Sequence, residues 1–593
     1  MLLTTSRLNQ TLRTFLMLGA VLSVAACSSE DSGGTSFVVP AKARGLLPDL
    51  ALADTNFEGD HFSGSSACGT CHTDSAPIEA ATMIVVEAEV PRNVSIGTAW
   101  ESSIMAQGAR DPYWHAIVAT ELHLYPNLSD EINDKCTRCH APMANELAKK
   151  TGQPIQLFDA LDASGAVVAE GYYDADNTND LFNHAMDGIS CTACHQIEDV
   201  GFGDKSSMSG GFTIATYSEE NRSDRPAYGQ YADPDAAYMI QQSGFSPQYS
   251  LHISTSEMCA TCHNLDVDVV DTEGNLVGTH FAEQTMYTEW KESAFNNGSP
   301  DDTCQGCHMP TLSQAVPIAN LGSSVSRDDF AEHTFLGANT IMQTMMDNYS
   351  EELGIDPNID FQSSIIRNRE FLKSSATLEL LAQQKTGNGV SFDLKVTNHA
   401  GHKLPSGYHS RRAYIHLVIT DAAGLVVFES GSMNANGSIN GVDEDADPSS
   451  WEPHYDVITN ANQVQVYQGV TGNSDGVRTH SLLNSFNFLK DNRITPMGFD
   501  KNAVNVDVAV TGGASTDPDF NQGSDTVTYQ LSLPQSGSYT VQAELRYQPF
   551  SYGHLAHVFS YGEEIDQVDM FRTIYDNTEL RDEVIATVVG TVQ

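Results

Sequence analysis

The chain has 593 residues, of which 77 are acidic and 30 are basic, so its formal net charge at pH 7 is −47. A chain of this length predicts several domains. The acidic balance argues against nucleic-acid binding, which draws its affinity from clustered lysine and arginine, and it favours cationic, metal or redox partners. With 22 proline and 45 glycine residues, the composition excludes a collagen-like repeat and wholesale disorder.

The N-terminus has the pattern of an export signal. Two arginines form a basic start, and the apolar stretch Phe15–Ala26 follows, which is too short for a permanent membrane helix. It ends in Val-Ala-Ala-Cys, which resembles the lipobox of bacterial lipoproteins, whose cysteine is lipidated. We therefore expect a lipoprotein signal peptide over residues 1–26 and a lipid on Cys27, with ordinary secretory cleavage as the alternative. Because Ser28 follows Cys27, the resemblance implies an outer-membrane lipoprotein, on the periplasmic or the cell-surface side.

Residues 27–50 are mostly small and polar and contain Pro40 and Pro48, which predicts a flexible tether. No later stretch is apolar for long enough to form a transmembrane helix. Any contact with the membrane is therefore expected to come from the lipid on Cys27.

Ten of the eleven cysteines lie in five copies of one pentapeptide, Cys-x-x-Cys-His. This pattern is typical of covalently attached haem c, because two thiols three residues apart reach one porphyrin edge and the next imidazole binds the iron as proximal ligand. Zinc sites and disulfide-exchange motifs also use Cys-x-x-Cys, but they need no histidine after it. We therefore expect five covalently attached haem c groups. The attachment residues are Cys68, Cys71, Cys136, Cys139, Cys191, Cys194, Cys259, Cys262, Cys304 and Cys307, and the proximal ligands are His72, His140, His195, His263 and His308.

Residues 51–345 contain all five motifs and form the expected pentahaem cytochrome domain. We expect this domain to consist mostly of loops and short helices, with few strands. One helix is expected from Asp111 to Leu124, where Trp114, Ile117 and Val118 share an apolar face. Export agrees with this interpretation, because a chain with free cysteines would oxidise at random outside the cytoplasm unless they were attached to haem.

Further side chains are candidates for the distal iron ligands. Three histidines stand seven residues before an attachment cysteine, which hints at a repeated haem-binding unit, namely His61, His184 and His252. His333 follows the last motif and is a candidate for the fifth haem. The remaining candidates are His115 and His123 on the expected helix, His402 in the following domain, and Met105, whose thioether would raise the potential of its haem. The sequence does not show which haems the three offset histidines would serve.

The pattern changes after the haem region. We expect a helical connector over residues 346–375, with a helix from Phe361 to Leu372, and an all-β, sandwich-like domain over residues 376–593. Apolar residues alternate with period two in three runs, which predicts strands at 390–396, 527–533 and 539–547. This domain contains no cysteine and carries no covalent haem.

Two acidic clusters in the β domain are candidate Ca²⁺ sites, because Ca²⁺ prefers carboxylate oxygen ligands. They are Asp443–Asp447 and Asp517–Gly523. The second departs from an EF-hand loop, since Gln522 stands where that loop needs glycine. We expect both clusters to be solvated acidic loops, with Ca²⁺ sites as the alternative.

Several segments resemble secreted bacterial multihaem c-type cytochromes in which a haem region precedes a β domain. The resemblance covers most of residues 55–590 and rests on His61–Ser65, Ala109–Pro112, Asp187–Ile189, Cys307–Pro310, and Gly401–Gly407 with Arg411 and Arg412. More distant relatives are the tetrahaem cytochrome and the octahaem hydroxylamine oxidoreductase of ammonia oxidisers. The resemblance implies closely stacked haems that conduct electrons.

The function expected from these features is electron transfer at the bacterial cell envelope, between redox partner proteins or to a periplasmic or extracellular acceptor. One alternative is a multihaem oxidoreductase that acts on a small nitrogen or sulfur compound at an open haem. Pentahaem nitrite reductases usually replace the histidine of one motif by lysine, whereas all five motifs here end in histidine, so we assign no catalytic residue. A second alternative is a haem-lined subunit of a filament.

Overall fold

The computed structural model describes residues 50–74, 83–87, 90–161, 166–173, 179–320, 325–533 and 537–593. The predicted signal peptide, Cys27 and the tether up to residue 49 lie outside the described residues. The described residues all fall into one compact unit. In this part of the chain, no helix has both the length and the apolar character needed to cross a membrane.

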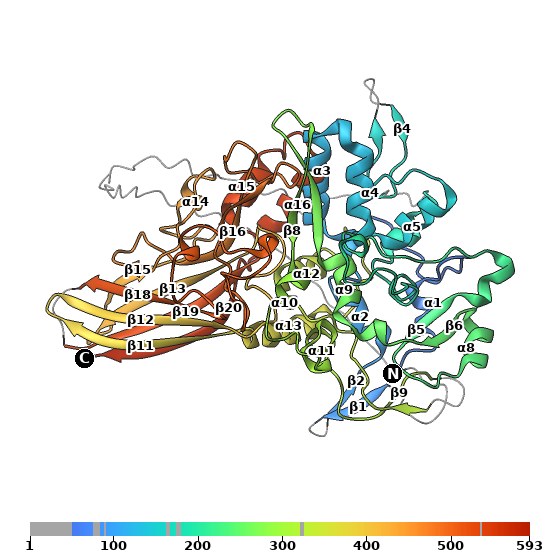
Figure 1. The fold of residues 1–593 in the computed structure, drawn as a ribbon, viewed down its shortest axis with the longest axis horizontal. Helices are drawn as coiled ribbons and strands as arrows, with labels where there is room; N and C mark the ends of the chain where they lie inside the picture. The colour runs from blue at the N-terminus through green and yellow to red at the C-terminus, as the bar shows by residue number, and fades with distance from the viewer. Residues whose placement is uncertain are drawn as a thin grey trace, which may run out of the picture. The chain divides into compact units, whose positions relative to one another are not determined.

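The haem region consists of short helices joined by loops (Figure 1), as the sequence predicts. The helix predicted from Asp111 to Leu124 is confirmed. It starts after Asp111 because the Asp111 carboxylate accepts hydrogen bonds from the backbone N–H groups of Tyr113 and Trp114. The α-helices of this region are α1 (Ser65–Gly69), α2 (Ile96–Glu101), α3 (Pro112–Leu124), α4 (Ser129–His140), α5 (Pro142–Thr151), α6 (Phe182–Met186), α7 (Cys191–Cys194), α8 (Ala236–Ser243), α9 (Ser256–His263), α10 (Met286–Lys291) and α11 (Cys304–His308).

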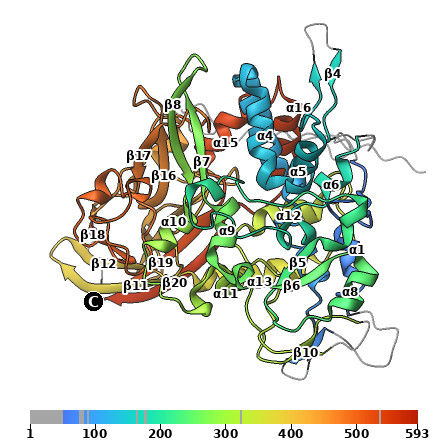
Figure 2. The same cartoon turned by 45° about the vertical axis from the view of Figure 1, so that its right-hand side comes forward.

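Strands in the haem region form only two-stranded sheets among the described residues. They are β1 (Ile84–Glu87) with β2 (Val90–Asn93), β3 (Ala160–Leu161) with β4 (Val167–Ala169), β5 (Pro226–Gly229) with β6 (Ser246–Tyr249), β7 (Leu265–Val270) with β8 (Leu276–Gln284), and β9 (Val316–Pro317) with β10 (Ser326–Arg327). The β7–β8 hairpin is longer than we expected. It is stabilised because Val267 and Phe281 pack against Phe488 of the C-terminal part. Figure 2 shows the hairpin beside the strands of that part.

Two helices connect the haem region to the C-terminal strands, α12 (Thr340–Asn348) and α13 (Phe361–Ser374), and the second confirms the predicted helix. The strands are β11 (Ala376–Thr386), β12 (Gly389–Asn398), β13 (Arg412–Asp421), β14 (Val426–Ser430), β15 (Val457–Ile458), β16 (Val466–Gly472), β17 (Asn487–Asp491), β18 (Ser524–Ser532), β19 (Tyr539–Gln548) and β20 (Glu583–Val592). The three strands predicted from alternation are confirmed as β12, β18 and β19.

These strands form two sheets that share one apolar core. One sheet has the order β11-β12-β18-β15, and the other has the order β17-β16-β13-β19-β20 with β14 beside β13. Phe392 and Tyr529 of the first sheet belong to the same buried cluster as Ile415 and Val541 of the second. Alternate residues along each strand therefore point into this core, which is why period-two alternation located the strands.

The expectation that residues 376–593 are all β is wrong. They also contain α14 (Asp443–Ala446), α15 (Tyr552–Phe559) and α16 (Asp566–Asp576). The helix α16 buries Val568, Phe571 and Ile574, which stand three residues apart and form an apolar stripe on one side of the helix. This helix packs against α3 of the haem region, which provides the partner surface that the stripe requires.

Candidate haem sites

Each Cys-x-x-Cys-His motif begins in a helix, namely α1, α4, α7, α9 or α11. In a helical turn, residues three and four apart lie on the same face. The two thiols of a motif therefore face the same side, and the imidazole that follows lies beside them. This is the local geometry that attachment of one porphyrin edge and ligation of its iron require.

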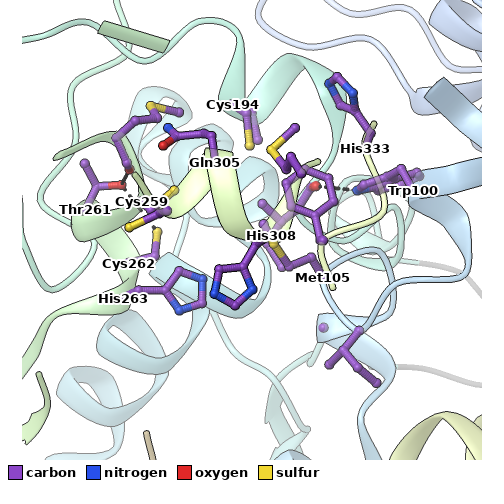
Figure 3. Close-up of a pocket in the computed structure, with 18 of the residues that line it drawn as sticks. Trp100, Met105, Cys194, Cys259, Thr261, Cys262, His263, Gln305, His308 and His333 are labelled. Carbon is purple, nitrogen blue, oxygen red and sulfur yellow. Dashed lines mark hydrogen bonds between the residues drawn. The ribbon is translucent and has the colours of Figure 1, made fainter. Parts of the chain in front are cut away.

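All five motifs meet at one cavity. The cavity has a volume of about 1390 Å³, and its lining includes all ten attachment cysteines and all five histidines of the motifs. Figure 3 shows Cys259 and Cys262 beside His263 in this cavity, with Cys194 and His308 also at its lining. The residues present thus fit several haem groups held near one another.

Contacts between thiols give the spatial order of the motifs. Three pairs of thiols from different motifs lie close enough to interact, namely Cys68 with Cys191, Cys139 with Cys262, and Cys259 with Cys304. The Cys194 thiol also lies within electrostatic range of the Cys262 thiol. The third motif is therefore next to the first and the fourth, and the fourth is next to the second, third and fifth.

Backbone carbonyls fix the ring orientation of four proximal histidines. The Nδ1–H groups donate from His72 to Ile318 O (2.6 Å), from His140 to Gly108 O (3.1 Å), from His195 to Tyr228 O (2.6 Å) and from His308 to Leu336 O (2.5 Å). Because a carbonyl only accepts, Nδ1 carries the proton and Nε2 keeps the lone pair that binds iron. Burial lowers the pKa of His140, His263 and His308 to about 4, so these rings are neutral at pH 7.

Two proximal histidines face a second imidazole. The rings of His195 and His333 are nearly parallel, with centroids 6.3 Å apart, and the rings of His308 and His402 have the same separation. A metal ion that bonds two opposite imidazole nitrogens at about 2 Å each holds the ring centres about 6.2 Å apart. Each of these pairs therefore has the separation that one iron between the rings requires.

The second ring of each pair has the same backbone support as the proximal rings. His333 Nδ1–H donates to Ala331 O (3.1 Å), and His402 Nδ1–H donates to Lys403 O (3.0 Å). Within the described ranges, His72, His140 and His263 have no second imidazole at the spacing of these two pairs. Met105, which Figure 3 shows, and His399 also line the cavity.

The seven-residue offset does not bring its three histidines to the lining of this cavity. His61 Nδ1 accepts from Tyr217 N–H at 3.3 Å. His184 packs its ring on Phe57, with centroids 4.3 Å apart. Both ring nitrogens of His252 have partners, because Nε2–H donates to Ile197 O (2.8 Å) and Nδ1 contacts Ser250 Oγ (2.6 Å).

The two histidines of α3 lie outside the cavity lining as well. His115 is buried, and its Nε2–H donates to Ala109 O at 2.8 Å. His123 is at the surface, with its side chain 42% exposed and its Nε2 3.4 Å from Glu564. Closeness in sequence to a haem motif therefore does not identify the histidines that face a proximal ligand.

Comparison with known proteins gives one likeness. No family model and no curated protein matches the sequence. Among solved structures, the chain is similar to a penta-heme cytochrome c552 from Thermochromatium tepidum, with 15% identity and a TM-score of 0.49, over 90% of this chain and 100% of that chain. Sequence comparison thus assigns the chain to no family.

A buried ion-pair network holds the loop that carries His402. The backbone N–H of Lys403 donates to Glu289 on α10 (2.9 Å), and the Lys403 ammonium lies 2.6 Å from Asp491. Arg493 joins Asp491 (2.8 Å) and Glu289 (3.2 Å). Burial alone would raise the pKa of Asp491, but Arg493 and Lys403 outweigh it and hold that pKa well below its ordinary value. The network ties the β part to the haem region at the position of His402.

We expect Asp491→Asn to lower the free energy of unfolding of the haem-loaded protein by about 3–5 kcal/mol, because two buried cations lose their shared anion. The depressed pKa means that the stabilisation is present above about pH 4 and is lost as the pH falls below it. Chemical denaturation measures both effects. Asp233→Asn is the control, because Asp233 is 78% exposed beside Arg327 and should change stability by less than about 1 kcal/mol. Wild-type stability in Asp491→Asn would contradict the role of the network.

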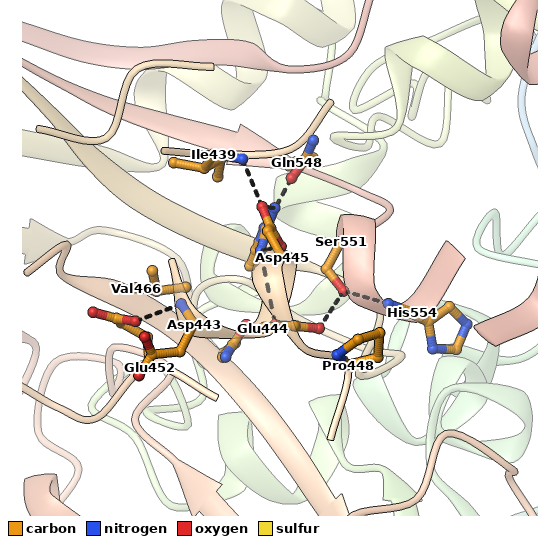
Figure 4. A network of polar contacts seen from close by, with 12 residues as sticks. Ile439, Asp443, Glu444, Asp445, Pro448, Glu452, Val466, Gln548, Ser551 and His554 are labelled. Carbon is orange, nitrogen blue, oxygen red and sulfur yellow. Dashed lines mark hydrogen bonds and ion pairs between the residues drawn. The ribbon is translucent and has the colours of Figure 1, made fainter. Parts of the chain in front are cut away.

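The first acidic cluster is paired with arginines. Asp445 forms a bidentate contact with Arg412 (2.7 and 2.8 Å), and Glu444 lies 2.7 Å from Arg478 (Figure 4). The expectation of a solvated loop is wrong for these two carboxylates, which are buried. They neutralise buried guanidinium groups instead of facing water, because the arginines approach from distant parts of the chain.

The second acidic cluster gathers carboxylates. Oxygen atoms of Asp456, Asp517 and Asp519 lie within 4.8 Å of one another, a spacing that could hold a metal ion. His454 Nε2–H donates to Asp517 at 3.0 Å. Binding of Ca²⁺ at this cluster remains a prediction.

Proposed function

We propose that this protein carries five covalently attached haem c groups and transfers electrons. The observation that carries the proposal is the single cavity lined by all ten cysteines and all five histidines of the motifs. When bound, the haem irons supply reversible one-electron chemistry, and neighbouring haems exchange electrons.

The residues have distinct roles in this proposal. The cysteines fix the porphyrin edges, and the histidines of the motifs are the proximal ligands. His333 and His402 would help to hold the irons of the third and fifth sites, since they face His195 and His308 with ring centroids 6.3 Å apart. Backbone carbonyls hold the Nδ1 protons and thereby orient the rings and raise their basicity. The thiol contacts make the fourth site a junction between the second, third and fifth sites.

The proposal includes the domain organisation and location predicted from the sequence. Residues 51–345 bind haem, residues 346–375 connect, and residues 376–593 form a sandwich-like β domain that supplies His402. Export and a lipid on Cys27 would anchor the protein at the outer membrane. The charge of −47 favours a redox partner with a cationic docking surface and disfavours nucleic acid.

A second candidate function is chemistry at an open haem, on a small nitrogen or sulfur compound. It is favoured by the three proximal histidines, His72, His140 and His263, that face no second imidazole in the described part of the chain. Glu121 and Glu283 line the same cavity. Burial raises the pKa of both carboxyls to about 7, so they could hold or release a proton near neutral pH.

Low-temperature electron paramagnetic resonance of the oxidised protein, followed by a reductive titration with carbon monoxide, separates the two functions. Electron transfer predicts only low-spin iron, no uptake of carbon monoxide, and reversible reduction of all five haems. A high-spin signal that shifts with nitrite, together with uptake of carbon monoxide, would contradict it and support the open haem.

A further inference from the structure

The C-terminal part contains a cluster of four histidines that lies outside the lining of the haem cavity. His409 lies between β12 and β13, His480 lies between β16 and β17, and His554 and His557 share one face of α15. The ring centroids are 5.5 Å apart for His480 and His554, 5.2 Å for His480 and His557, and 5.9 Å for His409 and His554. We refer to these four residues as the histidine cluster.

Several ring nitrogens of the histidine cluster have no hydrogen-bond partner although they are buried. They are both nitrogens of His409, Nδ1 of His554 and Nε2 of His557. Buried polar atoms in folded proteins are nearly always paired, so a group of exceptions at one place indicates a missing partner such as an ion. A buried nitrogen without a partner also lowers the stability of the folded protein, and a bound ion would remove that cost.

The tautomer of His480 follows from its partner. Its Nε2 lies 3.1 Å from the backbone oxygen of Pro448. A carbonyl only accepts, so Nε2 carries the proton and Nδ1 holds a lone pair. A metal-ligating histidine typically has this arrangement, with one nitrogen donating to a carbonyl and the other free for the metal.

His554 uses one ring nitrogen outside the cluster. Its Nε2 is hydrogen-bonded to the Tyr113 hydroxyl at 2.8 Å. Its buried Nδ1 has no hydrogen-bond partner and is therefore the nitrogen that is available to a metal ion.

The environment keeps the rings neutral. Burial lowers the pKa of His409 and His480 to about 3 and that of His557 to about 4, so they are in the form that binds metals at pH 7. Arg478 acts on all four rings, and Glu444, which lies 2.7 Å from Arg478, opposes its charge at His409 and His480. Figure 4 shows Glu444 engaged with Ser551 at the start of α15, with the His554 ring directed away from it.

We propose that the histidine cluster binds one first-row transition-metal ion through imidazole nitrogens, with Cu²⁺ bound more tightly than Zn²⁺. Imidazole suits both ions, and Cu²⁺ stands highest in the affinity order. Two imidazoles on one ion hold their centres between about 4.4 Å at right angles and about 6.2 Å when opposite. The separations of 5.2 to 5.9 Å fall in this range.

Binding requires the rings to turn. No three of the four residues bring ring nitrogens within 4.8 Å of one another as the described chain stands. The centroid separations of 5.2 to 5.9 Å are of the size that one ion requires, so binding would turn the rings about their Cβ–Cγ bonds and exchange the hydrogen bonds of His480 and His554 for metal bonds. The ion would lie close to the second haem site, because Tyr113 precedes Trp114, whose ring stacks on His140 at 4.4 Å. The proposal goes beyond electron transfer and does not depend on it.

The test uses the haem-loaded full chain after treatment with a chelator. Equilibrium dialysis against CuSO₄ or ZnSO₄, with iron as the internal reference in elemental analysis, should find one copper or one zinc per chain. The copper signal in paramagnetic resonance should show nitrogen hyperfine coupling. His480→Gln and His557→Gln should each weaken binding by at least about 100-fold. His280→Gln is the matched control, because that side chain is 65% exposed beside Asp268, and it should bind as the wild type does.

Less than one equivalent of metal in the wild type would overturn the proposal. So would wild-type affinity in both His480→Gln and His557→Gln, or weakened binding in His280→Gln. The melting temperature and haem content of each variant establish that it folds. If His480→Gln fails to fold, His557→Gln decides the outcome, because its ring lies at the edge of the cluster and forms none of the bonds that fix His480 and His554.

Discussion

His402→Ala is expected to leave one haem without its sixth ligand. His402 faces His308 at 6.3 Å, the separation that one iron between two imidazoles requires. Its removal should convert one haem of the five from low-spin to high-spin and allow one more equivalent of carbon monoxide to bind after reduction. Paramagnetic resonance and a carbon monoxide difference spectrum measure these changes against the wild type.

Two further variants show whether the spectral change comes from the loss of an iron ligand. His402→Met should keep the iron low-spin and raise its potential, because a thioether replaces an imidazole. His399→Ala is the matched control on the same loop, because the His399 ring also lines the cavity but its Nε2 is hydrogen-bonded to Thr377 Oγ1 at 3.1 Å, and it should leave all spectra unchanged. If His402→Ala kept every haem low-spin and bound no additional carbon monoxide, His402 would not be the sixth ligand of the fifth haem.

Replacing Cys259 and Cys262 together by alanine should remove the haem at the junction and destabilise the whole haem region. The two thiols contact Cys304 and Cys139, so this site adjoins two other motifs directly. The void left by a missing haem exceeds that of any side chain. We therefore expect the loss in stability to exceed about 5 kcal/mol, the most that a single large-to-small core substitution removes. Haem content per chain and thermal unfolding measure the effect.

The matched control is the double replacement of Cys68 and Cys71 by alanine. Cys68 contacts the third motif through Cys191, so this site lies at one end of the order. This variant should also lose one haem, but its melting temperature should fall less than that of the junction variant. Equal losses of stability in the two variants would contradict the spatial order.

The sequence predicted those elements whose pattern can be seen within a few consecutive residues. Asp111 caps α3 because its carboxylate reaches backbone N–H groups two and three residues ahead. Strands β12, β18 and β19 were predicted because each buries alternate residues in one core. The assignment of the attachment cysteines and proximal histidines rests on the pentapeptide alone and stays a prediction.

The rest depends on contacts between distant parts of the chain. His402 was one candidate among several, and what distinguishes it is a separation of 6.3 Å from His308. A shared sequence offset gave no such information, because His252 uses both ring nitrogens in hydrogen bonds. The first acidic cluster was misjudged for the same reason, since Arg412 reaches Asp445 across 33 residues of sequence.

The most direct test of the central claim, that each of the five motifs holds one haem, is the intact mass of the exported protein under denaturing conditions. Covalent attachment through the ten cysteines predicts the mass of the processed polypeptide plus five haem groups. A smaller number of haems, or the mass of the polypeptide alone with or without disulfides, would contradict it.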